Sequence, residues 1–430
     1  MSAADLARLQ FAATTGIHWL FVILTMGLVP LVAIMHTRAA ATRDPALRTT
    51  RERMTRFWGQ LYVVNYAVGI ATGLVMEFQF GLSWSGLSTF AGNVFGAPLA
   101  LETLIAFFAE STFLGMWIFG WGRLRTGVHV TLIWLVALTA YASAYWIMVA
   151  NGFLQHPVGH QVRDGAAYLT DFGALLTNDS ALVALLHVAL GAFTTGGVFV
   201  AGVSAWHFLR RTTQTRLFRE SLRLGLWVST IASFFVVVVG EMQRPVIAAT
   251  QPMKEAVIRG RGVAELQEQL VEEHGPGNYV PWEETIRFSM DAMSLIGNTV
   301  STITLIALVL VWKDRVVRWR PVARVLVAMI PFPFLASVGG WVVREVGRQP
   351  WLIYGELTVE DALSNVSRGS LLVSCVAFIA LFVALAVTNW TLITRFARKG
   401  PDATQLGVTE PLPEGGGGPG VEEKQPVATY

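Results

Sequence analysis

The sequence predicts an all-α membrane protein with about nine transmembrane helices. Of its 430 residues, 53% are hydrophobic and only 14% are charged. The mean hydropathy is +0.51, and long apolar stretches recur along the chain. A composition this apolar excludes a soluble globular domain and an intrinsically disordered chain. We therefore expect a multi-pass protein of a cell membrane.

The apolar stretches define the expected helices. Crossing about 30 Å of hydrocarbon takes about 20 helical residues. Stretches of suitable length lie at about 10–36, 58–80, 98–121, 129–150, 181–209, 222–243, 286–312, 323–345 and 369–394. The first is too long for the core of a signal peptide, so we expect it to be a retained span.

The basic residues predict the orientation of these helices. Lys and Arg concentrate on alternate connections, at 37–57, 122–128, 210–223 and 313–324 and in the segment from 395 onward. Such connections stay on the cytoplasmic side of a membrane. We therefore expect the N-terminus outside and the C-terminus in the cytoplasm.

Four regions follow from the pattern of spans. Residues 1–243 hold helices one to six, 244–285 an outer loop, 286–399 helices seven to nine, and 400–430 a disordered cytoplasmic tail containing GGGGPG. The outer loop contains VAELQEQLVEEH, which has a helical pattern. It is interpreted either as an ordered outer domain or as a solvated loop. Shorter outer segments are expected at 81–97, 151–180 and 346–368.

Charge and cysteine content limit the functional classes. The formal net charge of +3 creates no strong field toward nucleic acid. Cys375 is the single cysteine and lies in an apolar run. It allows neither a disulfide within the chain nor a metal site built from several thiolates.

Five possible iron ligands fall at a similar depth, in the outer third of the predicted bilayer. They come from five different spans and are His18, Glu102, His187, Met293 and Glu345. Imidazole, thioether and carboxylate groups are all ligands of haem iron. Each also has a structural explanation, because histidine and methionine pack in cores and a glutamate at a helix start favours the helix dipole. Their common depth favours haem.

Glu110 forms a second polar feature inside the membrane. It lies eight residues after Glu102, about 12 Å deeper and about 80° around a regular helix. With Ser111 and Thr112 it makes a polar patch. A proton relay and a buried structural carboxylate both explain it.

Five segments of the sequence carry a family resemblance. They are RLQFAATTGIHWLF, FWGQLYVVNYAVGIATGLVMEFQFG, FGAPLALETLIAFFAESTFLG, WLVALTAYASAYWIMVANGF and GWVVREVGRQPW, and they span residues 8 to about 351. These segments resemble subunit I of the cytochrome bd-type quinol oxidases. Several spaced blocks of this length are much more specific than a single short motif.

The resemblance implies a set of haem groups and their ligands. His187 and Met293 match the axial pair of a low-spin haem b, where electrons enter. His18 and Glu345 match ligands of a high-spin pair, haem b and haem d, with Glu102 as the carboxylate beside it. Family members differ in the iron that His18 holds, so it is assigned only to the pair.

Other residues acquire roles from the same resemblance. Trp341 matches a tryptophan between the haems, and simple aromatic packing explains it equally well. Arg348 and Arg8 are expected to bind haem propionates, since a guanidinium can hold a carboxylate with two hydrogen bonds. Glu110 and Ser111 match the family's proton route to the oxygen-reducing site.

The outer loop departs from the family pattern. In GEMQRPVIAATQPMKEAVIRG, Lys254 occupies the expected quinol-site position and Glu241 can replace the usual acid. Arg259 stands where the family has a second carboxylate. Quinol oxidation needs acceptors for two hydroxyl protons, so this change leaves an altered electron donor as an alternative.

The resemblance implies a terminal oxidase. Electrons from quinol would pass through low-spin haem b to the high-spin haem pair, which reduces oxygen to water and generates membrane potential. The alternatives are a haem-b-only relative with an altered donor or acceptor, and a transporter or channel, although no inverted repeat is visible. The family implies a second membrane subunit, small single-helix subunits and contact with membrane lipid. It also implies the plasma membrane of a prokaryote.

Overall fold

A computed structural model describes residues 2–312 and 315–407 of the chain. Within these residues, nine helical segments are long and apolar enough to cross a membrane. This confirms the predicted all-α, polytopic fold class. The expected disordered tail, 400–430, lies mostly outside the described residues. Its described part is ordered, since Pro401–Ala403 forms the short helix η2 and Leu406 is buried.

The helices are longer than the apolar stretches that predict them. The first four spans are α1 (Ala3–Ala40), α2 (Pro45–Ser83), the continuous helix formed by α3 (Ser85–Leu101), the π-helix η1 (Glu102–Phe107) and α4 (Phe108–Phe119), and α5 (Thr126–Gln155). The others are α6 (Phe172–Leu176) with α7 (Asp179–Leu209), α8 (Thr215–Thr250), α11 (Glu283–Trp312), α13 (Arg320–Ala328) with α14 (Phe332–Val346), and α15 (Arg368–Lys399).

Residues 85–97 differ from the expectation of an outer connection. They are helical, and the third span begins at Ser85 rather than near residue 98. The glycines of this stretch favour a loop in isolation. Here Leu87, Ala91 and Val94 are buried against Phe153 and Ile353, and this packing holds the helix. Glu102 therefore lies inside a long helix and not at its start.

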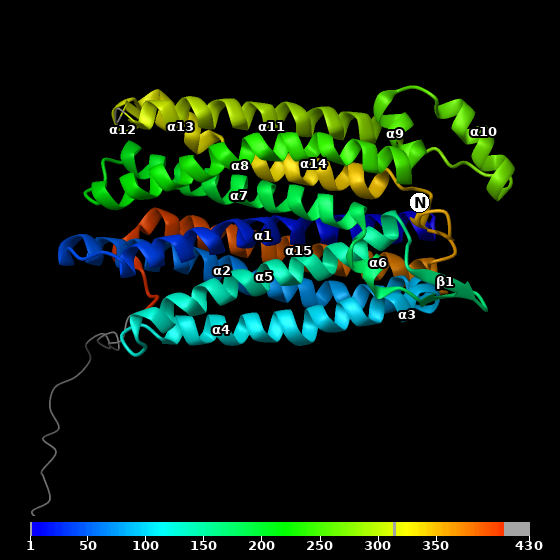
Figure 1. The fold of residues 1–430 in the computed structure, drawn as a ribbon, viewed down its shortest axis with the longest axis horizontal. Coiled ribbons are helices and arrows are strands. Elements are labelled where there is room, and N and C mark those ends of the chain that lie inside the picture. Colours follow the sequence, from blue (N-terminus) through cyan, green and yellow to red (C-terminus); the bar gives the residue numbers. More distant parts are fainter. Residues whose placement is uncertain (1, 313–314, 408–430) are drawn as a thin grey trace, which may run out of the picture.

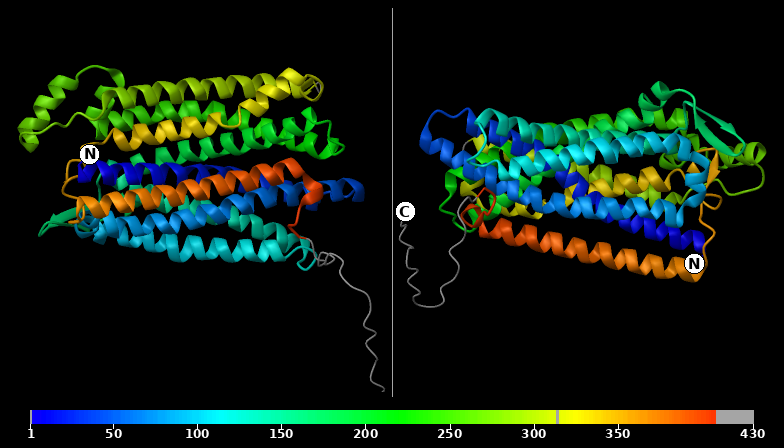
Figure 2. Two further views of the ribbon diagram at one scale, coloured as in Figure 1. Left: turned by 180° about the vertical axis from the view of Figure 1, so that it is seen from behind. Right: turned by 90° about the horizontal axis from the view of Figure 1, so that it is seen from below.

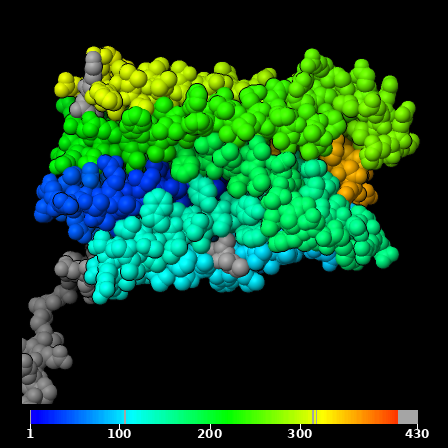
Figure 3. Space-filling model, viewed as in Figure 1, coloured from blue at the N-terminus to red at the C-terminus, as the bar shows by residue number. Residues whose placement is uncertain are grey.

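The connection between α8 and α11, which the sequence predicts to be an outer loop, is also more helical than expected. Helix α8 continues to Thr250 and includes Pro245. Two short helices follow, α9 (Pro252–Arg259) and α10 (Val263–His274). The VAELQEQLVEEH segment is α10, as its pattern predicts, and none of its residues is buried. It is an ordered but solvated helix that projects past the bundle in the space-filling view (Figure 3).

Helix α1 lies at the centre of the bundle (Figures 1 and 2). It contacts α2 and α5 on one side, and α7, α14 and α15 on others. At its crossing with α7, a Cβ on Gly27 would lie 2.2 Å from the carbonyl oxygen of Ala192 and 2.8 Å from the backbone nitrogen of Gly196. Only glycine permits this approach, which brings the two helices into backbone contact.

The two ends of the bundle differ in chemistry. Figure 1 shows the N-terminus, β1 (His160–Arg163), α9 and α10 at one end, and α12 (Arg315–Arg318) at the other. At the latter end Glu220 pairs with Arg38 and Arg51, and Arg53 pairs with Asp402. The arginine-rich connections therefore gather at one end. Small antiparallel pairings, β1 with β2 (Ala166–Leu169) and β3 (Trp351–Ile353) with β4 (Leu357–Thr358), cover the other.

Candidate functional site

His18 is held in the form that suits a metal ligand. Its Nδ1 lies 2.9 Å from Oγ1 of Thr72 on α2. That hydroxyl oxygen also lies 2.9 Å from the backbone oxygens of Val68 and Gly69, so its proton points to them. Thr72 must then accept a hydrogen bond from Nδ1–H. The lone pair of His18 resides on Nε2, and a second hydrogen bond of this kind orients ligating histidines.

His187 lies where α7 and α8 pack together. Its ring is close to Gly240, where an added Cβ would lie 3.3 Å from Cε1 of the imidazole. The His187 ring interacts with the backbone of Val236 on α8, although its buried Nδ1 atom forms no hydrogen bond of regular geometry among the described residues. A backbone group that holds one side of a histidine ring leaves the other nitrogen available to a metal. This observation fits an axial ligand of a haem.

Met293 on α11 also packs against a glycine of a neighbouring helix. A Cβ on Gly340 of α14 would lie 2.9 Å from the Met293 sulfur, so a larger residue there would displace the thioether from this position. Met290, by contrast, packs against an apolar cluster containing Met253 and Val343. The arrangement therefore fits Met293 better than Met290 as the ligand.

The small residues after His187 divide into two groups. Gly191 has no atom nearer to an added Cβ than 3.9 Å. Glycines near His187 and Met293 could offer open surface to a porphyrin, but Gly196 and Gly197 instead contact the backbones of α1 and α8. Gly297 on α11 has nothing within 4 Å of an added Cβ. Open surface is thus confined to Gly191 and Gly297 within this set.

Glu345 lies at the end of α14 in a dense polar network. Its Oε1 accepts hydrogen bonds from Asn151 and Gln155, at 2.9 and 3.2 Å. Its Oε2 accepts from Arg348, which is itself buried. The Nη1 of Arg348 is buried without a partner among the described residues. The site thus holds a fixed anion and a spare buried donor, which fits an iron ligand beside a haem propionate.

Arg344 is a member of this network that the sequence analysis missed. Its Nε donates to Asn151 at 2.5 Å, and its Nη2 donates to the carbonyl oxygen of Ser180. An arginine in the last turn of a membrane helix is costly and is by itself a signal of function. The residue stands next to Glu345 in the same motif, so that signal was present in the sequence.

Glu102 lies in the π-helical turn between α3 and α4. Its Oε1 accepts a hydrogen bond from Ser143 on α5 at 2.7 Å, and its Oε2 accepts one from Thr103 at 3.2 Å. The Thr103 hydroxyl also lies 3.2 Å from Glu77. Wide turns of this kind occur frequently at functional sites.

Glu110 is buried on α4, and Ser111 beside it is half-buried. The Tyr62 hydroxyl donates to Oε1 of Glu110 across 3.5 Å, and the Tyr66 ring packs against Tyr62 with ring centroids 5.7 Å apart. The carboxyl group is thus shielded from solvent and faces α2. This environment suits a group that exchanges protons inside the bundle.

The remaining two expected haem contacts lie on α1 and α14. Trp341 stacks on Trp19, with ring centroids 5.7 Å apart and planes 14° from parallel. Arg8 lies 3.8 Å from Asp5, and its buried Nε has no partner among the described residues. Trp341 thus packs between helices, and Arg8 keeps a donor free for an acidic group.

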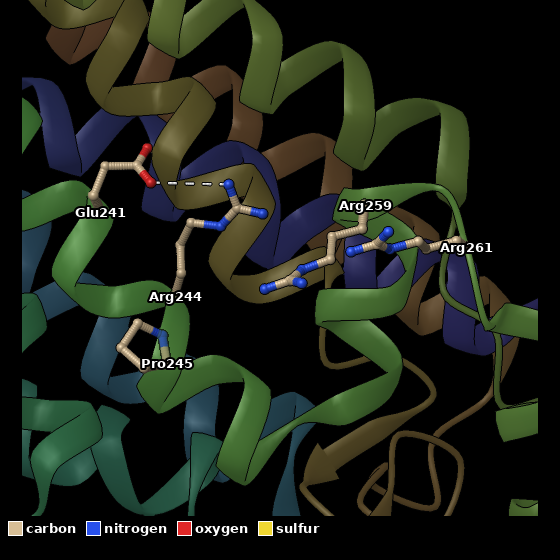
Figure 4. Close-up of a pocket in the computed structure, with 5 residues that line it drawn as sticks. All are labelled: Glu241, Arg244, Pro245, Arg259 and Arg261. Carbon is tan, nitrogen blue, oxygen red and sulfur yellow. Dashed lines mark ion pairs between the residues drawn. The ribbon is translucent and has the colours of Figure 1, made fainter.

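The two expected quinol residues face different surroundings. Lys254 on α9 is buried and donates to Oε1 of Gln155 at 2.8 Å and to the carbonyl oxygen of Arg344 at 3.0 Å. Burial, reinforced by Arg344, holds the pKa of Lys254 well below its usual range. Glu241 is exposed on α8 and pairs at 3.8 Å with Arg244. It lines an arginine-rich groove with Pro245, Arg259 and Arg261 (Figure 4).

These donors do not form a bare metal centre. In the part of the chain that the structure describes, no three His, Cys, Asp or Glu side chains are placed to hold one ion. Haem iron needs only one or two axial protein ligands. Single histidines and a thioether with prepared surroundings are therefore sufficient for haem.

Comparison with known proteins gives a consistent match. The family model for cytochrome bd terminal oxidase subunit I matches residues 6–271 and 261–401. Cytochrome bd ubiquinol oxidase subunit 1 of Bacillus subtilis (strain 168) is 37% identical, over 94% of this chain and 95% of that protein. Cytochrome bd-II ubiquinol oxidase subunit 1 of Escherichia coli (strain K12) is 30% identical, over 93% and 97%.

A solved structure shares the fold. The bd oxidase from Geobacillus thermodenitrificans superposes with a TM-score of 0.82, covering 92% of this chain and 98% of that chain. The two sequences are 23% identical. This likeness supports the arrangement of helices, and the curated relatives support the family.

Proposed function

The chain belongs to the cytochrome bd terminal oxidase subunit I family, and from this premise we propose that it oxidises quinol and passes the electrons through three haems to oxygen. The observation that carries the proposal is that the surrounding residues hold the two candidate histidine ligands in fixed orientations. His18 is fixed as one tautomer by Thr72, and the His187 ring is packed against Gly240 on α8.

Two sets of residues would hold the haems. His187 and Met293 would bind a low-spin haem b, supported by the glycines at 240 and 340 that leave room for both side chains. His18 and Glu345, with Glu102 beside them, would serve a high-spin haem b and haem d. Arg348 and Arg8 would donate to propionates with their unpartnered N–H groups. Bound haem supplies electron transfer and oxygen reduction, while the protein supplies ligands, orientation and exclusion of water.

Quinol oxidation is assigned to the end of the bundle that carries α9. A quinol releases two electrons and two hydroxyl protons when it becomes a quinone. The lowered pKa of Lys254 favours a neutral amine, which can accept a proton. The exposed carboxylate of Glu241 can accept the other and release it to the outer aqueous phase.

Protons for oxygen reduction would come from the opposite end. Four electrons from two quinols and four protons convert one oxygen molecule to two waters. Glu110, with Ser111 next to it and Tyr62 hydrogen-bonded to it, would carry protons inward to Glu102 and Ser143. With the arginine-rich end in the cytoplasm, this uptake and the outer release of quinol protons would generate membrane potential.

The family implies a complex in a membrane. We place the chain in the plasma membrane of a prokaryote, together with a second membrane subunit and small single-helix subunits. Exposed apolar side chains on α11 and α15, among them Phe288, Leu295, Val373 and Val376, provide surface for lipid or for such partners.

An optical spectrum of the purified complex, reduced and with carbon monoxide, tests the proposal. A chlorin signature with two protohaem signals is expected. Protohaem alone would favour the haem-b-only relative, and a colourless protein would favour a transporter or channel. His187→Ala should erase the low-spin signal and keep carbon monoxide binding, and Met293→Ala should also disturb that signal. His18→Ala should disturb the high-spin signals. Unchanged spectra in all three variants would contradict the ligand assignment.

A further inference from the structure

A groove at the outer end of α8 has an unusual excess of guanidinium groups. It has a volume of about 670 Å³ and is lined by Glu241, Arg244, Pro245, Arg259 and Arg261. Figure 4 shows Arg259 and Arg261 extending toward Arg244 and Glu241 from the other side of the groove. Three cations face two carboxylates here, Glu241 and the buried Glu255, so the groove keeps positive charge.

The buried carboxylate of Glu255 forms ion pairs with two of these arginines, Arg244 and Arg259. Its side chain is only 7% exposed, and its Oε1 lies 3.2 Å from Nη2 of Arg244 and 2.5 Å from Nε of Arg259. One buried carboxylate thus holds guanidinium groups from α8 and α9 side by side. A group held in this way loses less side-chain entropy when it binds a ligand.

The arginines keep donors for a further partner. Nε of Arg244 is buried and has no hydrogen-bond partner among the described residues. Arg259 uses its Nε for Glu255, which leaves its two terminal nitrogens for a ligand. Arg261 makes no ion pair within the described part of the chain and is exposed. Several converging guanidinium donors suit a planar or tetrahedral oxyanion better than the neutral ring of a quinol.

The surface next to the groove is apolar. Residues Ile231, Phe234, Val238 and Met242 recur at intervals of three or four on α8, and all are exposed. Residues with this spacing share one helix face, which continues to Glu241 and Pro245 in the groove. A ligand in the groove would therefore have its charged group among arginines and its apolar part along a membrane-facing stripe.

We propose that this groove binds the phosphate group of an anionic phospholipid, with acyl chains along the α8 stripe. The observations that carry the proposal are the three converging arginines, the buried carboxylate that fixes two of them, and the adjoining exposed apolar face. The groove shares Glu241 with the proposed quinol site. Lipid binding itself needs no electron transfer, so lipid exchange tests this proposal separately from oxidase activity.

Lipid exchange on the purified complex tests this site. The complex is placed in bilayer nanodiscs of phosphatidylcholine alone or with increasing phosphatidylglycerol, and bound lipid and thermal midpoint are measured. Retention of phosphatidylglycerol and a rise in the midpoint are expected, and Arg261→Gln and Arg259→Gln should each weaken this response about tenfold or more. Arg163→Gln, at the same end but far from the groove, serves as the matched control and should keep it.

Three results would overturn the proposal. Equal responses to the two lipids would show that no headgroup is recognised. A full response to inorganic phosphate alone would identify a site for free phosphate. An undiminished response in Arg261→Gln would place lipid recognition elsewhere, and this variant removes an exposed side chain without an ion pair, so folding does not obscure the result.

Discussion

Arg348, three residues after Glu345, donates two hydrogen bonds to the Glu345 carboxylate. Its Nη2 lies 2.5 Å and its Nε 3.2 Å from Oε2 of Glu345. Since Asn151 and Gln155 occupy Oε1, the orientation of the carboxylate is fixed from both sides. A proposed iron ligand is thereby held in place by groups that would not themselves touch the iron.

Removing the positive charge of Arg348 should be costly. In Arg348→Gln the carboxylate of Glu345 stays largely buried without its main counter-charge, for which we expect a loss of roughly 3–5 kcal/mol. Thermal unfolding of the purified complex measures it, and the high-spin optical bands should shift. Arg287→Gln, which breaks an exposed pair with Glu283, should cost only about 0.3–0.5 kcal/mol. Similar losses in the two variants would contradict the account.

Gly340→Ala should disturb the haem that Met293 is proposed to bind. The added methyl group would overlap the Met293 sulfur, whose distance of 2.9 Å is too short for a carbon contact. We expect a shifted or weakened low-spin spectrum and a destabilisation of about 1–3 kcal/mol. Gly127→Ala, at the start of α5 and away from the proposed haem ligands, is the control, because nothing lies within 4 Å of its added methyl. An unaltered spectrum in Gly340→Ala would argue against Met293 as the ligand.

Glu110→Gln should slow oxygen reduction without preventing haem reduction. The amide has the shape of the carboxyl group but cannot pass a proton, so turnover should fall about 100-fold or more. Oxygen consumption with quinol measures the loss, while reduction of the low-spin haem under anaerobic conditions should remain normal. Thr112→Val changes the exposed hydroxyl next in the patch, which bonds only to its own helix at Phe108. It should leave turnover unaltered; equal losses would point to a general defect of the patch.

Lys254 should give the complex a pH-dependent stability. Its pKa is lower in the folded than in the unfolded chain, so the unfolded chain binds the proton more tightly. Stability should therefore rise with pH between the folded pKa and about 10.4, the value of an exposed lysine. Lys254→Met should remove this part of the pH slope and raise the quinol KM. Lys399→Met, exposed at the other end, should retain both; a slope unaffected by Lys254→Met would refute the assignment.

The sequence predicts the positions of the membrane-crossing helices better than it predicts where each helix begins and ends. Long apolar runs fix where a chain must cross a membrane, because each buried backbone group needs an internal hydrogen bond. Residues 85–97 were missed since their glycines and serines weaken the local helical pattern, while Leu87 and Ala91 gain their burial from distant segments. The local sequence pattern does not show which distant segments will pack against a helix.

The candidate ligands could be named from the sequence, but the residues that prepare them could not. Thr72 binds His18 across 54 positions, and Ser143 binds Glu102 across 41. Threonine and serine are common in membrane helices and reveal nothing until the helices are packed. Arg344 is different, because a charged residue within a membrane helix indicates a functional site from the sequence alone.

The π-helical turn at Glu102–Phe107 sets the angle around the helix axis between the carboxylates of Glu102 and Glu110. In a regular helix an eight-residue separation leaves them about 80° apart, at about 100° for each residue. A π-helical turn absorbs one additional residue, so the separation acts as seven residues and brings them within about 20°. An inserted backbone unit, and not a side chain, thus aligns Glu110 beneath Glu102. Converting this turn into a regular helix of the same length would put the two acids about 80° out of line even though every chemical group remained.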